Sequence, residues 1–306
     1  MKELIIELSH NCNLACIMCG FGGKPASPKR FITWQTLNLI LDQVPSVPER
    51  VRLNGRGEST IHPAFIPMME HVQSRYPQSI INLFSNLMVT NKDLVYSLAE
   101  KEVQLFISMD SPNALELESI RRGARFSILE KNIKRLAIMK RRPHVVFTIQ
   151  EANLHRMVDM ARYCIDRNMH IIFNTIRRDE GIEPFIEMVQ NKREELAEAY
   201  RLIHALYDGT ELNCLLPNSI QGIIIQENGT NQTFGGKKEC PALREELCIL
   251  HNGAVTPCNM FNPYEYGNIL QERLGVILES EKRRWFLENN KAHSYCANCA
   301  CMGGTA

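Results

Sequence analysis

The sequence predicts an α/β protein built on a parallel sheet, and three observations lead to this class. Short apolar segments alternate with longer amphipathic segments six times between residues 3 and 207. Hydrophobic residues make up 44% of the 306 positions, which is enough for a large buried core. The alternation is evenly spaced, which suggests a barrel or part of one, although an open doubly wound sheet fits the same pattern.

The predicted strands are short, apolar and bounded by turn residues, as expected for a buried parallel sheet. They cover residues 3–8, 50–53, 80–84, 103–109, 145–150 and 171–175. A helix is predicted from Thr33, whose hydroxyl is placed to cap its first turn. Further helices follow at 64–76, 91–100, 126–141, 152–168 and from about 184. Functional residues are expected at the C-terminal ends of the strands.

The charge and cysteine content narrow the functional class. There are 35 basic and 34 acidic side chains, a formal net charge of +1, so neither nucleic acid nor a membrane surface is expected as a partner. No apolar run approaches the ~20 residues of a membrane span, and residues 1–4 lack the layout of a secretory signal. Eleven cysteines, several in Cys-x-x-Cys clusters, therefore favour metal binding in a reducing cytoplasm over disulfides.

The chain is organised around Cys12, Cys16 and Cys19, which follow the first predicted strand. Three thiolates at this C-x3-C-x2-C spacing can bind one 4Fe-4S cluster and leave one iron without a protein ligand. A structural zinc site is the alternative, with His10 as its fourth ligand. The spacing predicts iron chemistry at the end of the first strand.

This triad resembles the signature of the radical S-adenosylmethionine (SAM) enzymes, although Met18 stands where the family often has an aromatic residue. The resemblance implies a partial (β/α)6 TIM-like barrel. It also implies that the open iron binds SAM and that an electron donor such as flavodoxin or ferredoxin reduces the cluster. Cleavage of SAM would then give a 5'-deoxyadenosyl radical, which abstracts a substrate hydrogen.

A second motif of the family follows the second strand, where residues 54–63 resemble a Gly-Gly-Glu-Pro segment that runs into His-Pro. Gly57 and Glu58 are kept, whereas Arg56 and Ser59 depart from the consensus. By resemblance, the glycine lets the backbone approach the cofactor and the carboxylate accepts hydrogen bonds from its ammonium group. An ordinary strand-to-helix turn is the alternative.

A third motif follows the fourth strand, where Ser108 and a later Ile-Arg-Arg-Gly segment match cofactor contacts of the family. A guanidinium suits the SAM carboxylate because its fork can bind both oxygens. Either Arg121 or Arg122 could take this role, and a solvated helix start is the alternative. Three further strand-end residues match cofactor contacts or simply cap turns: Ser85, Asn86 and Asn174.

A boundary is predicted near Gly209, which divides the chain into a barrel at 1–209 and a second domain at 210–306. The later pattern resembles the SPASM auxiliary-cluster domain or its shortened form, twitch, built of a β-hairpin and a helix. Its expected ligands to a second 4Fe-4S cluster are Cys240, Cys258, Cys296 and Cys299, with Gly253 in the hairpin turn. The one-cluster form fits the number of cysteines better, and a zinc ribbon is the alternative.

Two cysteines of this region, Cys248 and Cys301, are left over, and either could replace one of the four ligands. Alternatively, the Cys248 thiol is catalytic and returns a hydrogen atom to a substrate radical, as related epimerases do. Epimerisation needs such a donor, whereas dehydrogenation needs a base and an electron acceptor. Cys164 and Cys214 lie in apolar segments and are expected in the core.

The triad begins at residue 12, which leaves no room before it for a peptide-recognition domain and favours a small polar substrate. The leading hypothesis is therefore a radical SAM epimerase or dehydrogenase acting on a sugar or aminocyclitol. Radical modification of a ribosomal peptide, by epimerisation or cross-linking, is the second hypothesis. A non-catalytic iron-sulfur or zinc protein is the third.

Overall fold

The computed structural model describes residues 1–19, 30–176, 182–217, 240, 242–259, 264–292 and 296. Its strands are β1 (Glu3–Ile6), β2 (Ala15–Cys16), β3 (Arg50–Arg52), β4 (Ile80–Ser85), β5 (Val103–Ser108), β6 (Arg121–Arg122), β7 (His144–Thr148), β8 (His170–Asn174), β9 (Cys214–Leu215), β10 (Glu246–Ile249), β11 (Ala254–Thr256) and β12 (Gly267–Asn268). Ten of them form one sheet in the order β12-β11-β10-β1-β3-β4-β5-β7-β8-β9. β2 and β6 form a separate two-stranded sheet.

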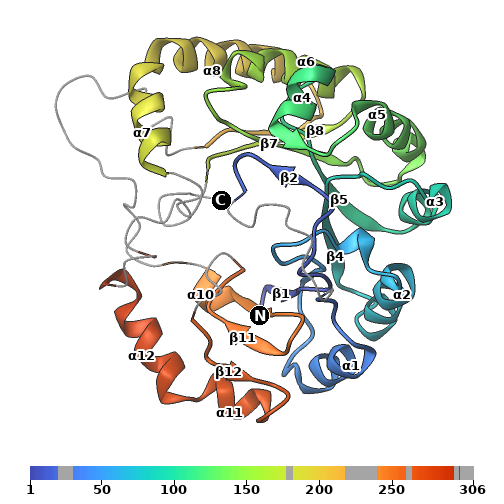
Figure 1. Ribbon diagram of the computed structural model, residues 1–306, viewed down its shortest axis with the longest axis vertical. Helices are drawn as coiled ribbons and strands as arrows, with labels where there is room; N and C mark the ends of the chain where they lie inside the picture. The colour runs from blue at the N-terminus through green and yellow to red at the C-terminus, as the bar shows by residue number, and fades with distance from the viewer. Residues whose placement is uncertain are drawn as a thin grey trace.

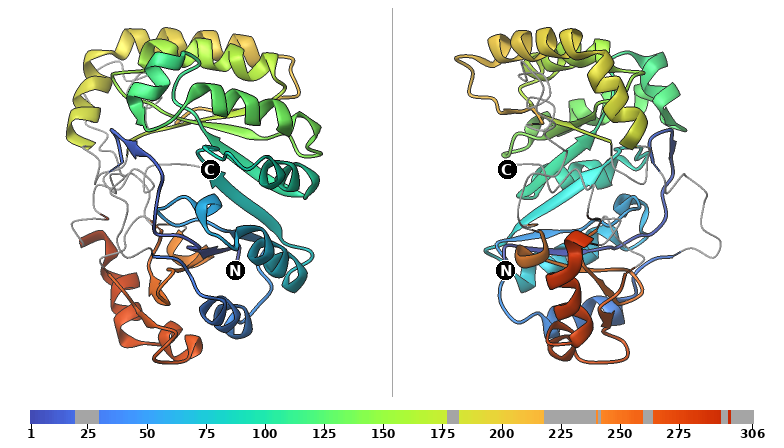
Figure 2. Two further views of the ribbon diagram at one scale, coloured as in Figure 1. Left: turned by 45° about the vertical axis from the view of Figure 1, so that its right-hand side comes forward. Right: turned by 90° about the vertical axis from the view of Figure 1, so that its left-hand side faces the viewer.

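The six predicted strands are β1, β3, β4, β5, β7 and β8, and each pairs in parallel with the next. Figures 1 and 2 show the sheet curving through the middle of the molecule. The partial barrel is therefore confirmed, and a flat doubly wound sheet is not observed. Among the described strands the barrel is open, because β12 and β9 are its two edges.

The helices are α1 (Trp34–Gln43), α2 (Phe65–Arg75), α3 (Lys92–Glu100), α4 (Ala114–Ile120), α5 (Phe126–Arg135), α6 (Met157–Asp166), α7 (Ile182–Asn191), α8 (Arg193–Tyr207), α10 (Ala242–Glu245), α11 (Leu274–Leu278) and α12 (Glu281–Asn289). Short 3-10 turns lie at Ser59–Ile61, Leu136–Ile138, Leu154–Arg156 and Asn290–Ala292. Thr33 caps α1 as predicted, since its hydroxyl accepts the Thr36 amide at 3.1 Å. No helix within the described ranges is long and apolar enough to cross a bilayer.

Some predicted helices are shorter or divided. The helix expected at 126–141 ends at Arg135 and continues as a 3-10 turn, and the long helix from 184 is divided into α7 and α8 at Lys192. The sequence analysis missed α4, which is short and is capped by the Asn113 side chain. It also missed β2 and β6, because two-residue strands carry no periodicity.

The sheet separates an apolar outer face from a mixed inner face. On β1, Leu4 and Ile6 join the main hydrophobic core with residues of the surrounding helices. Glu3, on the opposite face of β1, forms an ion pair with Arg52 of β3 and accepts the Asn82 side-chain amide at 3.0 Å. The alternation places apolar helix contacts outside and polar groups inside, as in a barrel whose binding site is internal.

Strands from beyond residue 209 extend both ends of the barrel sheet. β10 pairs in parallel with β1, with Ile5 opposite Cys248, and β9 pairs in parallel with β8. α11 and α12 lie beside the end of the sheet that holds β10, β11 and β12 (Figure 1). The boundary near Gly209 stays a prediction, and the parts on its two sides share a continuous hydrogen-bonded sheet.

Candidate functional site

The cysteine triad lies on the loop that follows β1, and a small sheet fixes this loop. Ala15 pairs with Arg122 and Cys16 with Arg121, so β2 and β6 join the triad to the segment after α4. The Cys19 amide donates to the Cys16 carbonyl at 3.1 Å, which closes a turn between these two cysteines. All three cysteines are half-buried.

The triad fits an iron-sulfur cluster. Cys12 interacts electrostatically with both Cys16 and Cys19, so the three sulfurs share one neighbourhood. Burial raises the pKa of the Cys12 thiol to about 12, so cluster assembly must displace its proton. Soft thiolates are the ligands that such clusters require.

Gly57 packs directly on the backbone that precedes Cys12. A side-chain carbon at this position would lie 2.5 Å from the Asn11 carbonyl oxygen and closer still to that of Ser9. The next residue, Glu58, donates its amide to the Asn11 carbonyl at 2.7 Å. The glycine of the predicted motif is therefore required by close contact between two backbone segments.

The Glu58 side chain is buried and is held by four protein donors. One carboxylate oxygen accepts the Thr60 amide at 3.2 Å, the Thr60 hydroxyl at 2.6 Å and the Ser85 hydroxyl at 2.9 Å. The other oxygen accepts the Asn86 amide at 2.8 Å. Burial raises the pKa of Glu58, and these donors oppose that rise. Glu58 therefore joins the ends of the second and third predicted strands.

Asn86 connects this group to the triad. Its side-chain amide lies 3.8 Å from the Cys12 sulfur and donates to the Asn13 side chain at 2.9 Å. The structure thus brings four of the predicted cofactor residues together at Cys12: Gly57, Glu58, Ser85 and Asn86.

The two candidate arginines have different surroundings. Arg121 is buried, lies 2.7 Å from the Asp110 carboxylate through Nε, and lies 3.9 Å from the Cys16 sulfur through Nη1. Arg122 is exposed. Burial raises the pKa of Asp110, and Arg121 and the Thr148 amide, which donates at 2.7 Å, oppose that rise. Only Arg121 faces the triad.

The sequence analysis missed Asp110, although its place directly after a predicted strand is a usable signal. Replacing Arg121 by alanine should destabilise the protein by about 3–5 kcal/mol, because a buried carboxylate would lose its charged partner. The same change at the exposed Arg122 should cost less than about 0.5 kcal/mol. Denaturant unfolding of both variants measures the difference, and equal losses would contradict the buried pair.

Ser108 and Asn174 lie on the inner face of the sheet, at the ends of β5 and β8. Ser108 is half-buried and Asn174 is exposed. No hydrogen bond within the described part of the chain joins either side chain to the triad. Their place at the barrel mouth matches the prediction, and their contact with a cofactor stays a prediction.

The auxiliary-cluster cysteines lie around the hairpin of β10 and β11. Cys240, Cys258 and Cys296 are half-buried against the core, and both Cys258 and Cys296 interact electrostatically with Tyr266. Gly253 adopts φ +83° in the hairpin turn, as the motif requires. The predicted ligand Cys299 and the leftover Cys301 lie outside the described residues.

Cys248 of β10 is 1% exposed and packs with Ile5, Leu250 and Ala254. Burial raises the pKa of its thiol, so the sulfur keeps its hydrogen, and Cys258 lies close enough to interact with it electrostatically. Of the two cysteines expected in the core, Cys164 is fully buried and Cys214 is half-buried against the core.

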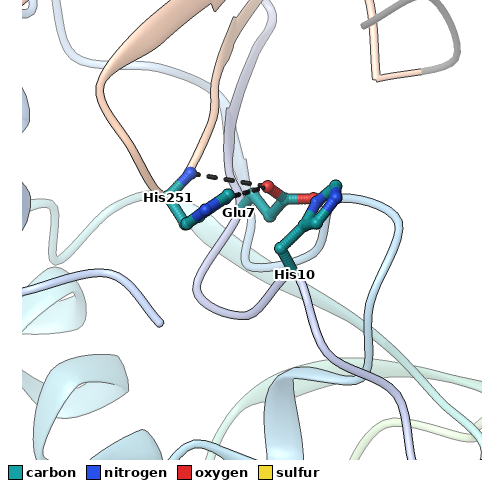
Figure 3. Close-up of side chains that lie close together, drawn as sticks. All are labelled: Glu7, His10 and His251. Carbon is teal, nitrogen blue, oxygen red and sulfur yellow. Dashed lines mark hydrogen bonds and ion pairs between the residues drawn. The ribbon is translucent and has the colours of Figure 1, made fainter. Parts of the chain in front are cut away.

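A further polar group, formed by three side chains, was not predicted (Figure 3). Glu7, directly after β1, accepts from His10 Nδ1 at 3.0 Å and from His251 Nδ1 at 2.8 Å. Burial alone would raise the pKa of Glu7, but the two histidines and the Arg56 amide lower it to about 2. The signal in the sequence was an acidic residue directly after the apolar run Leu4–Ile6 of the first predicted strand.

Comparison with known proteins gives one family match in the C-terminal region and similar proteins along most of the chain. Residues 240–300 match the SPASM family, an iron-sulfur cluster-binding domain. A relative along most of the chain is the tungsten-containing aldehyde ferredoxin oxidoreductase cofactor-modifying protein of Pyrococcus furiosus. It is 25% identical over 333 residues, which cover 98% of this chain and 87% of the relative.

Three solved structures share the fold. anSMEcpe with bound AdoMet has a TM-score of 0.73 and 17% identity over 99% of this chain and 89% of its own. Streptococcus suis SuiB bound to the precursor peptide SuiA has a TM-score of 0.71 and 14% identity over 98% of this chain and 70% of its own. BtrN in complex with AdoMet and 2-DOIA has a TM-score of 0.54 and 12% identity over 98% of this chain and 92% of its own.

Residues 240–300 therefore match an iron-sulfur cluster-binding domain of the SPASM family. The fold of the chain, with the cysteine triad after its first strand, is shared with the three solved structures.

Proposed function

We propose that this chain is an enzyme that reductively cleaves SAM and abstracts a hydrogen atom from a small polar substrate. Cys12, Cys16 and Cys19 would hold the catalytic 4Fe-4S cluster. When bound, the cluster and SAM supply the electron transfer and the 5'-deoxyadenosyl radical. The observation that carries the proposal is the buried polar framework that joins the triad to Glu58 and Arg121.

The framework suggests a role for each polar side chain. Arg121 directs Nε at Asp110 and Nη1 at Cys16, so we assign Nη2 to the SAM carboxylate. Asp110 keeps this guanidinium in place. Glu58 has one oxygen with a single protein donor, the Asn86 amide, and this oxygen is assigned to the SAM ammonium group. Ser108 and Asn174 would contact the cofactor from the inner face of the sheet.

Cys240, Cys258, Cys296 and Cys299 would hold the auxiliary 4Fe-4S cluster. Four thiolates saturate such a cluster, which suits electron transfer or a structural role. A small electron-transfer protein such as flavodoxin or ferredoxin would reduce the catalytic cluster. These assignments rest on the SPASM match and on the convergence of Cys258 and Cys296 near Tyr266.

A small polar substrate is supported by two of the similar proteins. One is described as cofactor-modifying, and BtrN was crystallised with 2-DOIA. A peptide substrate is the second candidate. The structures of SuiB and anSMEcpe that contain peptides both have TM-scores of 0.71, higher than the 0.54 of BtrN. The reaction would end in epimerisation or in dehydrogenation.

The Cys248 thiol bears on the choice between epimerisation and dehydrogenation, because a protonated thiol suits the hydrogen-atom donor that epimerisation needs. Replacing Cys248 by alanine should leave the iron content unchanged, since the thiol packs among apolar side chains of β1, of β11 and of the turn between β10 and β11. Iron analysis of the reconstituted variant checks this expectation. A loss of about four irons per chain would instead make Cys248 a cluster ligand.

The test of the proposed function is anaerobic reconstitution followed by iron and sulfide analysis. Two 4Fe-4S clusters correspond to about eight irons per chain. Addition of dithionite and SAM should then produce 5'-deoxyadenosine. Zinc in place of iron, without 5'-deoxyadenosine, would refute the proposal and leave a non-catalytic metal-stabilised protein.

A further inference from the structure

The group formed by Glu7, His10 and His251 brings together three segments of the chain (Figure 3). Glu7 directly follows β1, His10 stands two residues before Cys12, and His251 lies in the turn between β10 and β11. The two imidazole rings stack at 4.9 Å between centroids and 24° between planes. One ring nitrogen from each histidine and one carboxylate oxygen of Glu7 all lie within 4.8 Å of one another.

The negative charge of the buried Glu7 carboxylate needs a positive charge beside it. The Glu7 side chain is fully buried, with an exposed fraction of 0%. In the part of the chain that the structure describes, neither lysine nor arginine forms an ion pair with Glu7, and its charged or chargeable partners are the two histidines. The remaining donors are the backbone amides of Arg56, at 3.0 Å, and His251, at 3.5 Å. A buried carboxylate in such surroundings is stabilised by a cation.

The spacing of the atoms also fits coordination. Metal–nitrogen and metal–oxygen bonds of about 2.0–2.2 Å place two ligands roughly 3 Å apart at right angles and about 3.4 Å apart at the tetrahedral angle. The two nitrogen–oxygen distances are 3.0 Å and 2.8 Å, close to the right-angle value. Each Nδ1 approaches a different oxygen of the carboxylate, and one ligand atom from each of the three residues lies within reach of a common position.

We propose that Glu7, His10 and His251 bind one divalent transition-metal ion of the zinc or ferrous class. Two imidazoles and one carboxylate suit these ions better than magnesium or calcium, which prefer oxygen ligands. Three protein ligands leave coordination positions for water or for an oxygen atom of a small ligand. This site is separate from both cysteine sets, and its existence does not depend on the proposed reaction.

The test uses the reconstituted protein with both clusters loaded and zinc ion alone as the probe. The protein is incubated with one equivalent of zinc and desalted, and zinc and iron are then measured by mass spectrometry. The wild type should retain one zinc per chain with no loss of iron. Zinc X-ray absorption should show nitrogen and oxygen ligands at about 2.0–2.2 Å and no sulfur at about 2.3 Å.

Three variants make the test specific. His251→Ala and Glu7→Gln should each weaken zinc binding at least tenfold while the iron content is kept. If Glu7→Gln fails to fold, His251→Ala alone carries the comparison, since His251 lies in a hairpin turn. His155→Ala is the matched control, because the exposed His155 also contacts a glutamate, at 3.4 Å, and it should bind zinc like the wild type.

Three results would overturn the proposal. One is a wild type that retains no zinc, which would leave a purely hydrogen-bonded group. Another is equal zinc binding by His251→Ala and the wild type. The third is zinc uptake matched by iron loss, with sulfur in the zinc coordination shell, because that zinc would occupy the cysteine sites.

Discussion

Replacing Cys16 by alanine is expected to reduce 5'-deoxyadenosine formation to background and to lower the iron content from about eight to about four per chain. Cys16 is one of three proposed ligands to the catalytic cluster, and its sulfur also faces Arg121. Two thiolates do not hold a 4Fe-4S cluster firmly, so the site for SAM would be lost with it. Anaerobic iron analysis and chromatography of the reaction products measure both effects.

Cys214→Ala is the matched control for this prediction. Cys214 is also half-buried, but it lies in β9 and outside both proposed ligand sets. Its removal should leave the iron content and the product yield unchanged. Undiminished 5'-deoxyadenosine in Cys16→Ala would show that the triad does not hold the catalytic cluster.

Replacing Gly57 by alanine is expected to damage the same site without removing any ligand. The added methyl group would lie within 2.5 Å of the Asn11 carbonyl, so one of two backbone segments must move. Overpacking of this kind costs about 1–3 kcal/mol, and the movement would displace the loop that carries Cys12. We expect a lower unfolding free energy, a reduced iron content and loss of at least about 90% of the product.

Gly275→Ala in α11 is the control, because no atom lies within 4 Å of the added methyl group. Alanine favours helix over glycine by up to about 1 kcal/mol, so this variant should be as stable as the wild type or slightly more so. If Gly57→Ala has the same unfolding free energy and the same iron content as Gly275→Ala, the close approach of the two segments does not control the site.

Local patterns were sufficient to predict the strands and helices of the parallel sheet, whereas the partial barrel was predicted from the family resemblance. Each of the six strands is a short apolar run, and each predicted helix has a regular apolar face, so neither depends on distant contacts. Thr33 was identified as a cap because capping involves only the next few residues. The triad spacing is equally local, since it lies within eight consecutive residues.

The other site features depend on contacts between distant parts of the chain. Glu7 and His251 are separated by 244 positions, and no periodicity connects them. Arg121 and Arg122 are identical in type, and only the pairing of β2 with β6 shows that Arg121 faces Cys16. Two of the four donors to Glu58 come from Ser85 and Asn86, at the end of a later strand, so the sequence could suggest this carboxylate but not these distant partners.

The pairing of β10 with β1 has a consequence for the order of assembly during synthesis. β1 is synthesised long before β10, so one of its two hydrogen-bonding edges stays open until residues 246–249 arrive. An uncovered strand edge promotes association between chains, and such long-range pairing is slow to form. A chain truncated near residue 209 should therefore aggregate, and the C-terminal region completes the barrel sheet as well as supplying cysteines.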